Sequence, residues 1–525
     1  MPRILALDGV SEEGITILRG AGFDVDIKPA QKPAELAAII GEYDGLIVRS
    51  ATKVTAETIE KAGKLKVIGR AGAGTDNVDK DAATKRGIIV MNVPGGNTLS
   101  TCEHTFALLL ALCRNVPAAH QSMMEGRWDR KKFNGTELAG KTIGIVGAGR
   151  IGGAVAKRAQ AFEMKVLVFD PILTKMKAEA LGVELVSIDE IVERSDFITI
   201  HAPKSEKTNN LIGAEQIAKM KPTCRIVNCA RGGIVNEQDL ADALRAKQIA
   251  GAALDVYTSE PLENNPFLGL DNIVTTPHLA ASTEEAQLTV SVDIAKQIVD
   301  YLTTGAVVNA VNVPSMDAET AKQLQPWLVL AERLGKFVSQ YMEGRPTAVQ
   351  IAYDGELVVT DTYPITAAIL TGFLSPLVET VNAVSAPHLL KEYGIDFSET
   401  RSAAQSNYAF QVRVKAVTDT ESHEIAGTLF NGVEPRICGI DGTRVDVELV
   451  SGMVVCTNED KPMVLGRIAL TLGEAGVNIA NMALGRQSAG GHATTAINVD
   501  GRVERAVLEK LRAIPNVVEA RLVEV

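Results

Sequence analysis

The sequence predicts an α/β protein made of two parallel, helix-covered sheets and followed by α+β modules. Short apolar runs alternate with amphipathic helical segments over the first 95 residues, and the same alternation returns between Thr142 and Pro277. Such alternation is typical of parallel sheets wrapped by helices. The last 75 residues read strand, helix, strand, strand, helix, strand, which is the split βαβ pattern of ferredoxin-like modules. At roughly 150 residues per domain, 525 residues suggest three or four domains.

Strands are expected wherever a short apolar run lies between helical segments. In the first block these runs are Arg3–Leu7, Phe23–Ile27, Gly45–Val48, Val67–Gly69 and Ile88–Asn92. A long amphipathic helix begins at Thr98. A second, Glu284–Leu302, carries an apolar side with Leu288, Ile294, Ala295, Ile298, Val299 and Leu302. These two helices bracket the second block, and they could carry the chain out of the first domain and back into it.

The second block is therefore expected to be an insertion. The predicted domains are residues 1–97 together with 281–310, then 98–280, 316–450 and 452–525. In the third of these, Asn431-Gly432 and Asp441-Gly442 are strong hairpin signals between strand-like runs.

Composition excludes several functional classes. The net charge is -11 and only 4% of residues are aromatic, which argues against a nucleic-acid surface. The longest apolar run, Phe106–Cys113, is well short of the ~20 residues that a membrane span needs. Six cysteines without a CxxC pair fit a reducing cytoplasm, and seven scattered histidines give no metal-site spacing. We expect no partner of nucleic acid or membrane, and no metal.

A glycine loop predicts a dinucleotide site in the second block. An apolar strand, Thr142–Val146, runs into Gly147, Gly149 and Gly152, and a helical segment follows. Glycines at this spacing permit a tight turn, close approach of a pyrophosphate and helix-to-strand packing. The next strand ends in Asp170, 18 residues after Gly152, where an acid binds the ribose hydroxyls of NAD and repels the 2′-phosphate of NADP. The alternative is a structural glycine turn without a ligand.

Three further residues follow strand-like runs in the same block. Arg231, Asp255 and His278 should converge, because open α/β sheets bind ligands at the carboxyl ends of their strands. An imidazole beside a nicotinamide can accept a hydroxyl proton, and an arginine can hold a carboxylate with two hydrogen bonds. Taken singly, these residues have simpler interpretations: His278 could be a strand-end cap and Arg231 a surface charge. Glu260, which lies between Asp255 and His278, could be a turn residue before a proline.

As a set, these residues resemble the D-isomer-specific 2-hydroxyacid dehydrogenases, and the resemblance spans essentially the whole chain. The matching stretches are residues 48–54, 69–79, 147–152, 228–235, 252–256, 260–261 and 277–283. The resemblance implies a Rossmann-type nucleotide domain inserted in a flavodoxin-like substrate domain. It implies a catalytic triad of Arg231, Glu260 and His278.

The same resemblance implies ligand contacts elsewhere. Besides the glycines and Asp170, the residues expected to bind NAD are Arg150, Ile151, Cys229, Ala230 and Asp255. Those expected to bind the substrate are Arg49, Arg70 and Asn97, although ordinary surface charge is the alternative for the two arginines. Two departures stand out: Ala73 replaces a hydroxyl residue that touches the cofactor in relatives, and Ala280 replaces a usual glycine beside His278.

The C-terminal modules resemble those of the long members of this family. Residues 316–450 resemble their intervening domain, which is either a spacer that supports oligomerisation or a second effector site. The last module resembles an ACT domain, in which Asn458, Asp460 and Asn478 align with effector-binding positions. L-Serine is the candidate effector, and the resemblance implies a homodimer or homotetramer. Met463 stands where many members have glycine, so the effector loop departs from the pattern.

The activity implied by the resemblance is NAD-dependent oxidation of 3-phospho-D-glycerate to 3-phosphohydroxypyruvate, which opens L-serine synthesis. A dehydrogenase for another 2-hydroxy acid, acting on glyoxylate or 2-oxoglutarate in the reductive direction, is the alternative in the same class. A non-catalytic sensor of NAD or of an amino acid is the alternative in another class, and the intact triad argues against it.

Overall fold

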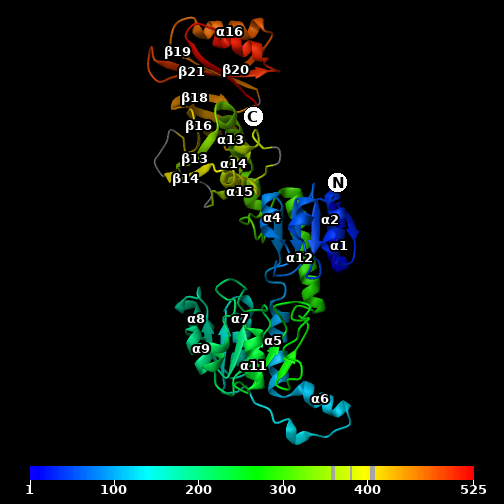
Figure 1. The fold of residues 1–525 in the computed structure, drawn as a ribbon. Helices are drawn as coiled ribbons and strands as arrows, with labels where there is room; N and C mark the ends of the chain where they lie inside the picture. Colours follow the sequence, from blue (N-terminus) through cyan, green and yellow to red (C-terminus); the bar gives the residue numbers. More distant parts are fainter. Residues whose placement is uncertain (356–360, 379–380, 403–407, 451) are drawn as a thin grey trace.

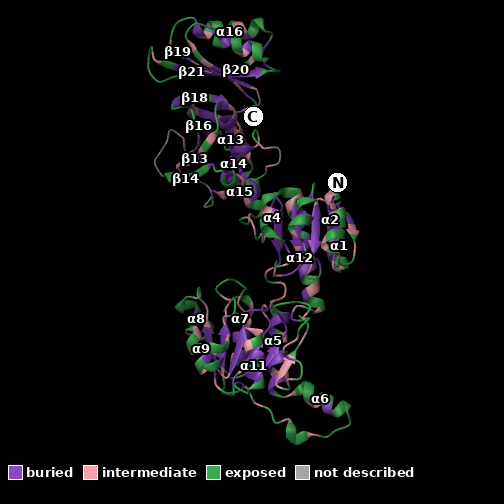
Figure 2. Ribbon diagram, viewed as in Figure 1, coloured by how far each residue is buried: buried purple, intermediate pink, exposed green. Residues whose placement is uncertain are grey.

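The computed structural model describes residues 1–355, 361–378, 381–402, 408–450 and 452–525. Its four sheets follow one another along an elongated molecule, with the nucleotide-domain sheet at one end and the last module at the other (Figure 1). In each sheet the central strands are largely buried, while the outer faces of the helices are exposed (Figure 2). The α/β fold class with C-terminal α+β modules is confirmed; the residue numbers of the domain boundaries remain predictions.

The first sheet has five parallel strands in the order β2-β1-β3-β4-β5, the flavodoxin-like order. Its strands are β1 Arg3–Ala6, β2 Asp24–Ile27, β3 Gly45–Val48, β4 Val67–Arg70 and β5 Ile89–Asn92. Its helices are α1 Glu12–Gly20, α2 Pro33–Ile39, η1 Ile40–Glu42, α3 Ala56–Glu60 and α4 Lys80–Lys85. Side-chain oxygens of Ser11, Thr55 and Asp79 cap the first turns of α1, α3 and α4.

The second sheet has seven parallel strands in the order β12-β11-β10-β9-β6-β7-β8. This order contains the 3-2-1-4-5-6 arrangement of the Rossmann fold with one added strand. The strands are β6 Thr142–Val146, β7 Lys165–Phe169, β8 Glu184–Leu185, β9 Phe197–Ile200, β10 Arg225–Asn228, β11 Gly251–Leu254 and β12 Ile273–Thr275. The helices are α7 Arg150–Ala161, α8 Lys175–Leu181, α9 Ile188–Arg194, α10 Ala214–Ala218 and α11 Glu237–Arg245.

Two long helices connect these sheets. Helix α5, Thr98–Cys113, leads from β5 to the second sheet, and α12, Glu284–Thr304, leads back and packs on α1 and β4. Leu288 was expected on the apolar side of α12, and this expectation is wrong, because 41% of Leu288 is exposed. The first turns of α12 extend beyond the sheet that the rest of the helix covers (Figure 1). Helix α6, Val116–Met124, and η2, Arg130–Lys132, form an arm that projects from the second sheet.

The intervening module has a six-stranded sheet in the order β14-β13-β15-β16-β17-β18, antiparallel except for β13 with β14. The strands are β13 Pro346–Gly355, β14 Asp396–Ser402, β15 Phe410–Thr418, β16 Ser422–Phe430, β17 Glu434–Ile440 and β18 Thr443–Glu448. The helices are α13 Ala318–Tyr341, α14 Tyr363–Leu374 and α15 Ala386–Glu392. Both expected hairpins are confirmed, with positive φ at Asn431-Gly432 and at Asp441-Gly442.

The last module follows the expected strand and helix order. Its elements are β19 Met453–Glu459, α16 Val464–Glu474, β20 Asn478–Arg486, β21 His492–Asp500, α17 Arg505–Arg512 and β22 Val517–Val523. The antiparallel sheet, β20-β21-β19-β22, packs one face on α16 and α17 and the other on the intervening module. Arg521 in β22 pairs with Glu421 through two N–O contacts of 3.1 Å, which joins the two modules.

Among the helices of the described ranges, none combines the length and the apolar character that crossing a membrane would require.

Candidate active site and cofactor site

The glycine loop between β6 and α7 has the three properties that a pyrophosphate site needs. Gly147 has φ +93°, a left-handed conformation that favours glycine. A Cβ on Gly152 would lie 1.9 Å from the carbonyl oxygen of Gly147, so the helix packs on the turn only without a side chain. A Cβ on Gly149 would meet nothing within 4 Å, which leaves open space at the N-terminus of α7. The residues therefore fit a dinucleotide phosphate at this helix end.

Asp170, at the end of β7, supports the same loop. One carboxylate oxygen accepts the backbone N–H of Ala148 at 2.8 Å, and the other accepts those of Ile172 and Leu173 at 2.9 and 3.0 Å. A cavity of about 430 Å³ opens between Asp170, Gly149 and α8. Because each carboxylate oxygen can accept more than one hydrogen bond, Asp170 can also bind the hydroxyls of a ribose in this cavity.

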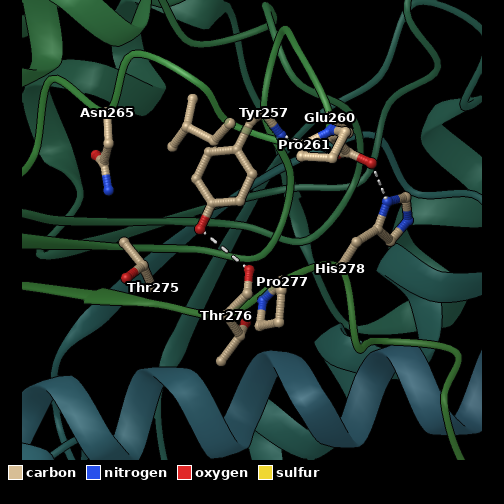
Figure 3. A pocket seen from close by; sticks show the side chains of 9 residues that line it. Tyr257, Glu260, Pro261, Asn265, Thr275, Thr276, Pro277 and His278 are labelled. Carbon is tan, nitrogen blue, oxygen red and sulfur yellow. Dashed lines mark hydrogen bonds and ion pairs between the residues drawn. The ribbon is translucent and has the colours of Figure 1, made fainter.

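The candidate base lies at the end of β12. The Nδ1 atom of His278 is 2.6 Å from Oε2 of Glu260, and the two side chains point toward each other across the rim of a cavity of about 440 Å³ (Figure 3). This hydrogen bond raises the pKa of His278 above its ordinary value, and burial opposes the shift. Burial raises the pKa of Glu260, but the hydrogen bonds from His278 and from the Tyr257 amide outweigh it and lower the pKa. The dyad is thus suited to accept a proton at His278 and to stabilise the resulting cation.

The turn that carries His278 is fixed from behind by Asp255. His278 has φ +55°, a conformation that non-glycine residues rarely adopt. The fully buried Asp255 carboxylate accepts the backbone N–H groups of Leu279 and Ala280 at 2.7 and 2.9 Å, and the Thr276 hydroxyl at 2.6 Å. His104 on α5 approaches the same carboxylate at 3.2 Å. In this structure Asp255 is therefore an anchor of the catalytic turn, and its expected contact with NAD remains a prediction.

Arg231 follows β10 in a tightly braced turn. The Asn228 side chain donates to the carbonyl of Arg231 at 2.9 Å and accepts the N–H of Ala230 at 3.0 Å. A Cβ on the next residue, Gly232, would lie 1.8 Å from the backbone of Tyr257, so only glycine fits. Cys229 is buried, and burial raises the pKa of its thiol to about 12, which leaves it uncharged. Cys229 and Ala230 can line a cofactor only as neutral packing surface.

The arginines of the first sheet approach this turn from the other side of the cleft. Arg49 follows β3, and Arg70 is the last residue of β4. Burial, together with the like charges of Arg231 and Arg49, lowers the pKa of Arg70 to about 10. Within the described residues, Nε of Arg70 is buried without a hydrogen-bond partner. Three clustered guanidinium groups with an unused N–H form a site that fits an anion.

Two further polar residues are Asn97, expected to bind the substrate, and Asp8, which contacts the loop of Arg49. Asn97 begins α5, and its side-chain oxygen is buried without a partner among the residues the structure describes. Asp8 accepts the backbone N–H groups of Arg49 and Thr52 at 2.9 and 3.0 Å. Asp8 therefore fixes the loop that presents the Arg49 side chain.

In the last module, the three expected effector residues have separate partners. Asp460 accepts from Arg486 at 3.0 Å and from the N–H of Gly490 at 3.1 Å, whereas Asn478 donates to Asp500 at 2.7 Å. Asn458 is buried, and its side-chain oxygen has no partner in the described part of the chain. The structure therefore does not join Asp460 to Asn478 by a hydrogen bond in one chain.

Several supporting residues were not singled out from the sequence. Asp8, Asp76, His104 and Asn228 each contact a predicted site residue or its turn. Asp76 lies within the quoted motif 69–79, and Asn228 within 228–235, so their motifs were visible. His104 gave no signal, because it is one of several polar residues in the first half of α5.

A glycine loop with a ribose-side carboxylate, and a His/Glu dyad at the strand ends, define a nicotinamide-dependent dehydrogenase. The comparisons agree: residues 106–280 match the family model of the D-isomer specific 2-hydroxyacid dehydrogenase NAD-binding domain, and residues 323–441 match that of the D-3-phosphoglycerate dehydrogenase intervening domain.

Similarity to individual proteins extends over the full length. The chain is 43% identical to D-3-phosphoglycerate dehydrogenase of Methanocaldococcus jannaschii, with 100% of both chains covered, and 40% identical to that of Bacillus subtilis, with the same coverage. The NAD-dependent formate dehydrogenase of Staphylococcus aureus, solved in complex with NAD, shares 32% identity at a TM-score of 0.54, over 60% of this chain and 99% of that one. The chain belongs to the D-3-phosphoglycerate dehydrogenase family, and its cofactor is NAD.

Proposed function

We propose that the protein oxidises 3-phospho-D-glycerate to 3-phosphohydroxypyruvate with NAD, the first step of L-serine biosynthesis. The observation that carries the proposal is the cluster of Arg49, Arg70 and Arg231 beside the His278–Glu260 dyad. The charge of Arg231 lowers the pKa of both Arg70 and His278, which supports one common site for these groups. A substrate with a carboxylate and a phosphate matches several arginines better than a small monoanion does.

Each group has a distinct task in this reaction. Arg231 binds the substrate carboxylate, and Arg49, Arg70 and Asn97 bind the phosphate end. Neutral His278 accepts the proton of the C2 hydroxyl, and Glu260 stabilises the imidazolium that forms. Bound NAD supplies the hydride acceptor. Gly147, Gly149, Arg150, Ile151, Gly152 and Asp170 hold the dinucleotide, with Cys229, Ala230 and Asp255 toward its nicotinamide end.

The test is a substrate panel followed by NADH absorbance, with hydrazine present only in the oxidative assays, where it traps the 2-oxo product. The panel contains 3-phospho-D-glycerate, D-glycerate and D-2-hydroxyglutarate, and glyoxylate and 2-oxoglutarate are tested in the reductive direction. We expect the highest kcat/KM with 3-phospho-D-glycerate. A higher value for an unphosphorylated acid would replace this substrate assignment by the alternative one.

We propose in addition that the protein is a homo-oligomer, a dimer or tetramer, in the cytoplasm. The arm formed by α6 and η2 exposes Val116, Met123, Met124 and Trp128, a set of apolar side chains that a second copy of the chain would cover. Six free, buried cysteines suit a reducing compartment. Sedimentation of the full chain at several concentrations tests the assembly.

We also propose that the last module is an ACT domain with L-serine as its effector. The unpartnered buried oxygen of Asn458 supports a ligand that donates hydrogen bonds, as an ammonium group does. Asp460 of one chain and Asn478 of its neighbour would complete the site. Calorimetry of the full chain with L-serine, together with activity in its presence, tests this proposal. Absence of binding would leave the module as an assembly element.

A further inference from the structure

A carboxylate from the first sheet holds the arginine of the second. Asp76 lies in the loop after β4, and Arg231 follows β10, 155 positions later in the chain. The Nε–H of Arg231 donates to Oδ2 of Asp76 at 2.9 Å. This ion pair crosses the cleft between two sheets that have separate hydrophobic cores. It therefore forms only when the two sides of the cleft stand as close as they do here.

The pairing leaves the substrate-binding edge of the guanidinium available. One N–H of the NH1 group donates to the carbonyl of Ala230 at 2.7 Å. Among the described residues, no hydrogen bond occupies the NH2 group. Two fixed contacts, at Nε and at NH1, determine the plane of the guanidinium, and the remaining N–H groups can still hold a carboxylate with two hydrogen bonds.

The loop that presents Asp76 is itself fixed. The side chain of the next residue, Asn77, donates to the carbonyls of Arg49 and Thr52 at 2.7 and 2.6 Å. A Cβ on Gly74 would lie 2.0 Å from the NH2 group of Arg231, so the loop approaches the guanidinium as closely as a glycine permits. The position of the Asp76 carboxylate thus follows from the backbone and not from a free side chain.

Stability does not explain this ion pair. The side chains of Arg231 and Asp76 are 34% and 69% exposed, and exposed pairs contribute only about 0–1 kcal/mol. The ion pair matters more for where the Arg231 side chain lies than for stability, because Arg49 and Arg70 carry like charges nearby. Without the negative charge of Asp76, Arg231 would be repelled from the two other cations.

We propose that Asp76 is a positioning residue: on closure of the cleft it orients Arg231 for the substrate carboxylate. The proposal rests on the function proposed above, because it assumes that Arg231 binds the carboxylate of a 2-hydroxy acid. Asp76 does not touch the reacting atoms. Its effect is on the fraction of bound substrate that lies correctly for reaction, and thus on kcat more than on KM.

The experiment compares Asp76→Ala, Asp76→Asn, Arg231→Ala and the double variant Asp76→Ala/Arg231→Ala. Asp81→Asn is the charge control, because Asp81 is an exposed acid on the neighbouring helix α4. Misplacement of a binding group can lower the reaction rate by about 100-fold, so we expect kcat of Asp76→Ala to fall by about 10- to 100-fold. We expect KM for 3-phospho-D-glycerate not to rise, because the cleft gains net positive charge, and NAD affinity by calorimetry to stay unchanged.

Two further results separate positioning from a general structural effect. Asp76→Asn keeps an oxygen that accepts from Nε, so its kcat should stay within about threefold of wild type. The double variant should be no worse than Arg231→Ala, because residues that act as one unit are not additive. A kcat of Asp76→Ala within about twofold of wild type, or losses that multiply in the double variant, would overturn the proposal.

The substrate assignment can fail without affecting this test. If wild-type protein oxidises a different 2-hydroxy acid and not 3-phospho-D-glycerate, the same variants are compared on that acid, because it has the carboxylate that Arg231 binds. If wild type is active and Asp76→Ala equals it, the positioning role alone is wrong.

Discussion

Asp255 holds the backbone of His278 in place: the His278 N–H donates to the Asp255 carbonyl at 2.8 Å, and the Asp255 carboxylate accepts the N–H groups of Leu279 and Ala280. A left-handed conformation of a non-glycine residue costs about 1–2 kcal/mol. Three backbone hydrogen bonds that the buried Asp255 accepts offset that cost and fix the imidazole against Glu260. A third residue, Asp255, therefore fixes the backbone from which His278 reaches Glu260.

Replacement of His278 by alanine should remove most of the turnover. General base catalysis contributes about 10²–10⁴-fold, so we expect kcat to fall by that range. NAD affinity should be kept, because the glycine loop and Asp170 are untouched. Steady-state kinetics and calorimetry with NAD measure the two effects. Turnover near the wild-type value would remove His278 from the mechanism.

Glu260→Gln should shift the acid limb of the pH–rate profile to lower pH. Oxidation requires neutral His278, so activity falls as pH drops through the pKa of this group. Glu260 raises that pKa through a hydrogen bond and its charge, and glutamine removes the charge. The acid limb should therefore move to lower pH. The plateau value of kcat should fall, because the imidazolium loses its counter-charge. An unchanged limb would show that another group sets the profile.

Asp170 should make the enzyme prefer NAD strongly over NADP, because its carboxylate would face the 2′-phosphate. The structure adds that Asp170 accepts the N–H of Ala148 in the glycine loop. Asp170→Ala should therefore weaken NAD binding and not simply exchange the two cofactors. The kcat/KM values for both cofactors, before and after substitution, decide this. Equal values for the wild type would contradict the assignment.

Arg49→Ala and Arg70→Ala should raise KM for 3-phospho-D-glycerate more than KM for D-glycerate, which lacks the phosphate. A charged hydrogen bond contributes about 1.5–3 kcal/mol, so a loss of roughly 10- to 100-fold in kcat/KM is expected for the phosphorylated substrate. Lys53→Ala, on the loop after Arg49, is the charge control. Equal losses on both substrates would mean that the arginines do not bind the phosphate.

Met463→Gly should stabilise the last module. Met463 has φ +71° at the start of α16, where a non-glycine residue costs about 1–2 kcal/mol and glycine loses about 0.5–1 kcal/mol in chain entropy. We expect a gain of up to about 1 kcal/mol, seen by differential scanning calorimetry of the full chain. Leu470→Gly, at an exposed position inside α16, should instead destabilise the module. A lower transition temperature for Met463→Gly would contradict this view of the loop.

Local sequence patterns were sufficient for much of the fold. The spacing of Gly147, Gly149 and Gly152 predicts a phosphate turn because each glycine has a steric task that depends on its near neighbours. The hairpins at Asn431-Gly432 and Asp441-Gly442 follow from the same kind of local rule, the left-handed conformation of both turn residues.

Contacts between distant segments could not be predicted in this way. The pairing of Arg231 with Asp76 depends on how two sheets face each other, and the anchoring of Asp255 by His104 depends on where α5 crosses behind β11. Leu288 was wrongly expected to be buried for a related reason. Helical periodicity predicts which face of a helix is apolar, but not how far along the helix the partner sheet extends. The sequence therefore predicted the candidate site residues, but not the distant residues that hold them in place.

The chain passes between the first two sheets twice, after β5 and before α12, but reaches the intervening module by the single segment that leaves α12 at Gly305. A domain attached by two chain connections can rotate mainly about the line that joins them. A module attached by a single connection is not restricted to one axis of rotation. A single proteolytic cut after α12 would break the one covalent link to the intervening and last modules, which share a core. The hydrogen bond from Asn382 to the Gly87 carbonyl, at 2.9 Å, and the packing of Val384 on the first core would still hold them there. One cut at either of the two connections would leave the first two sheets still joined by the other connection.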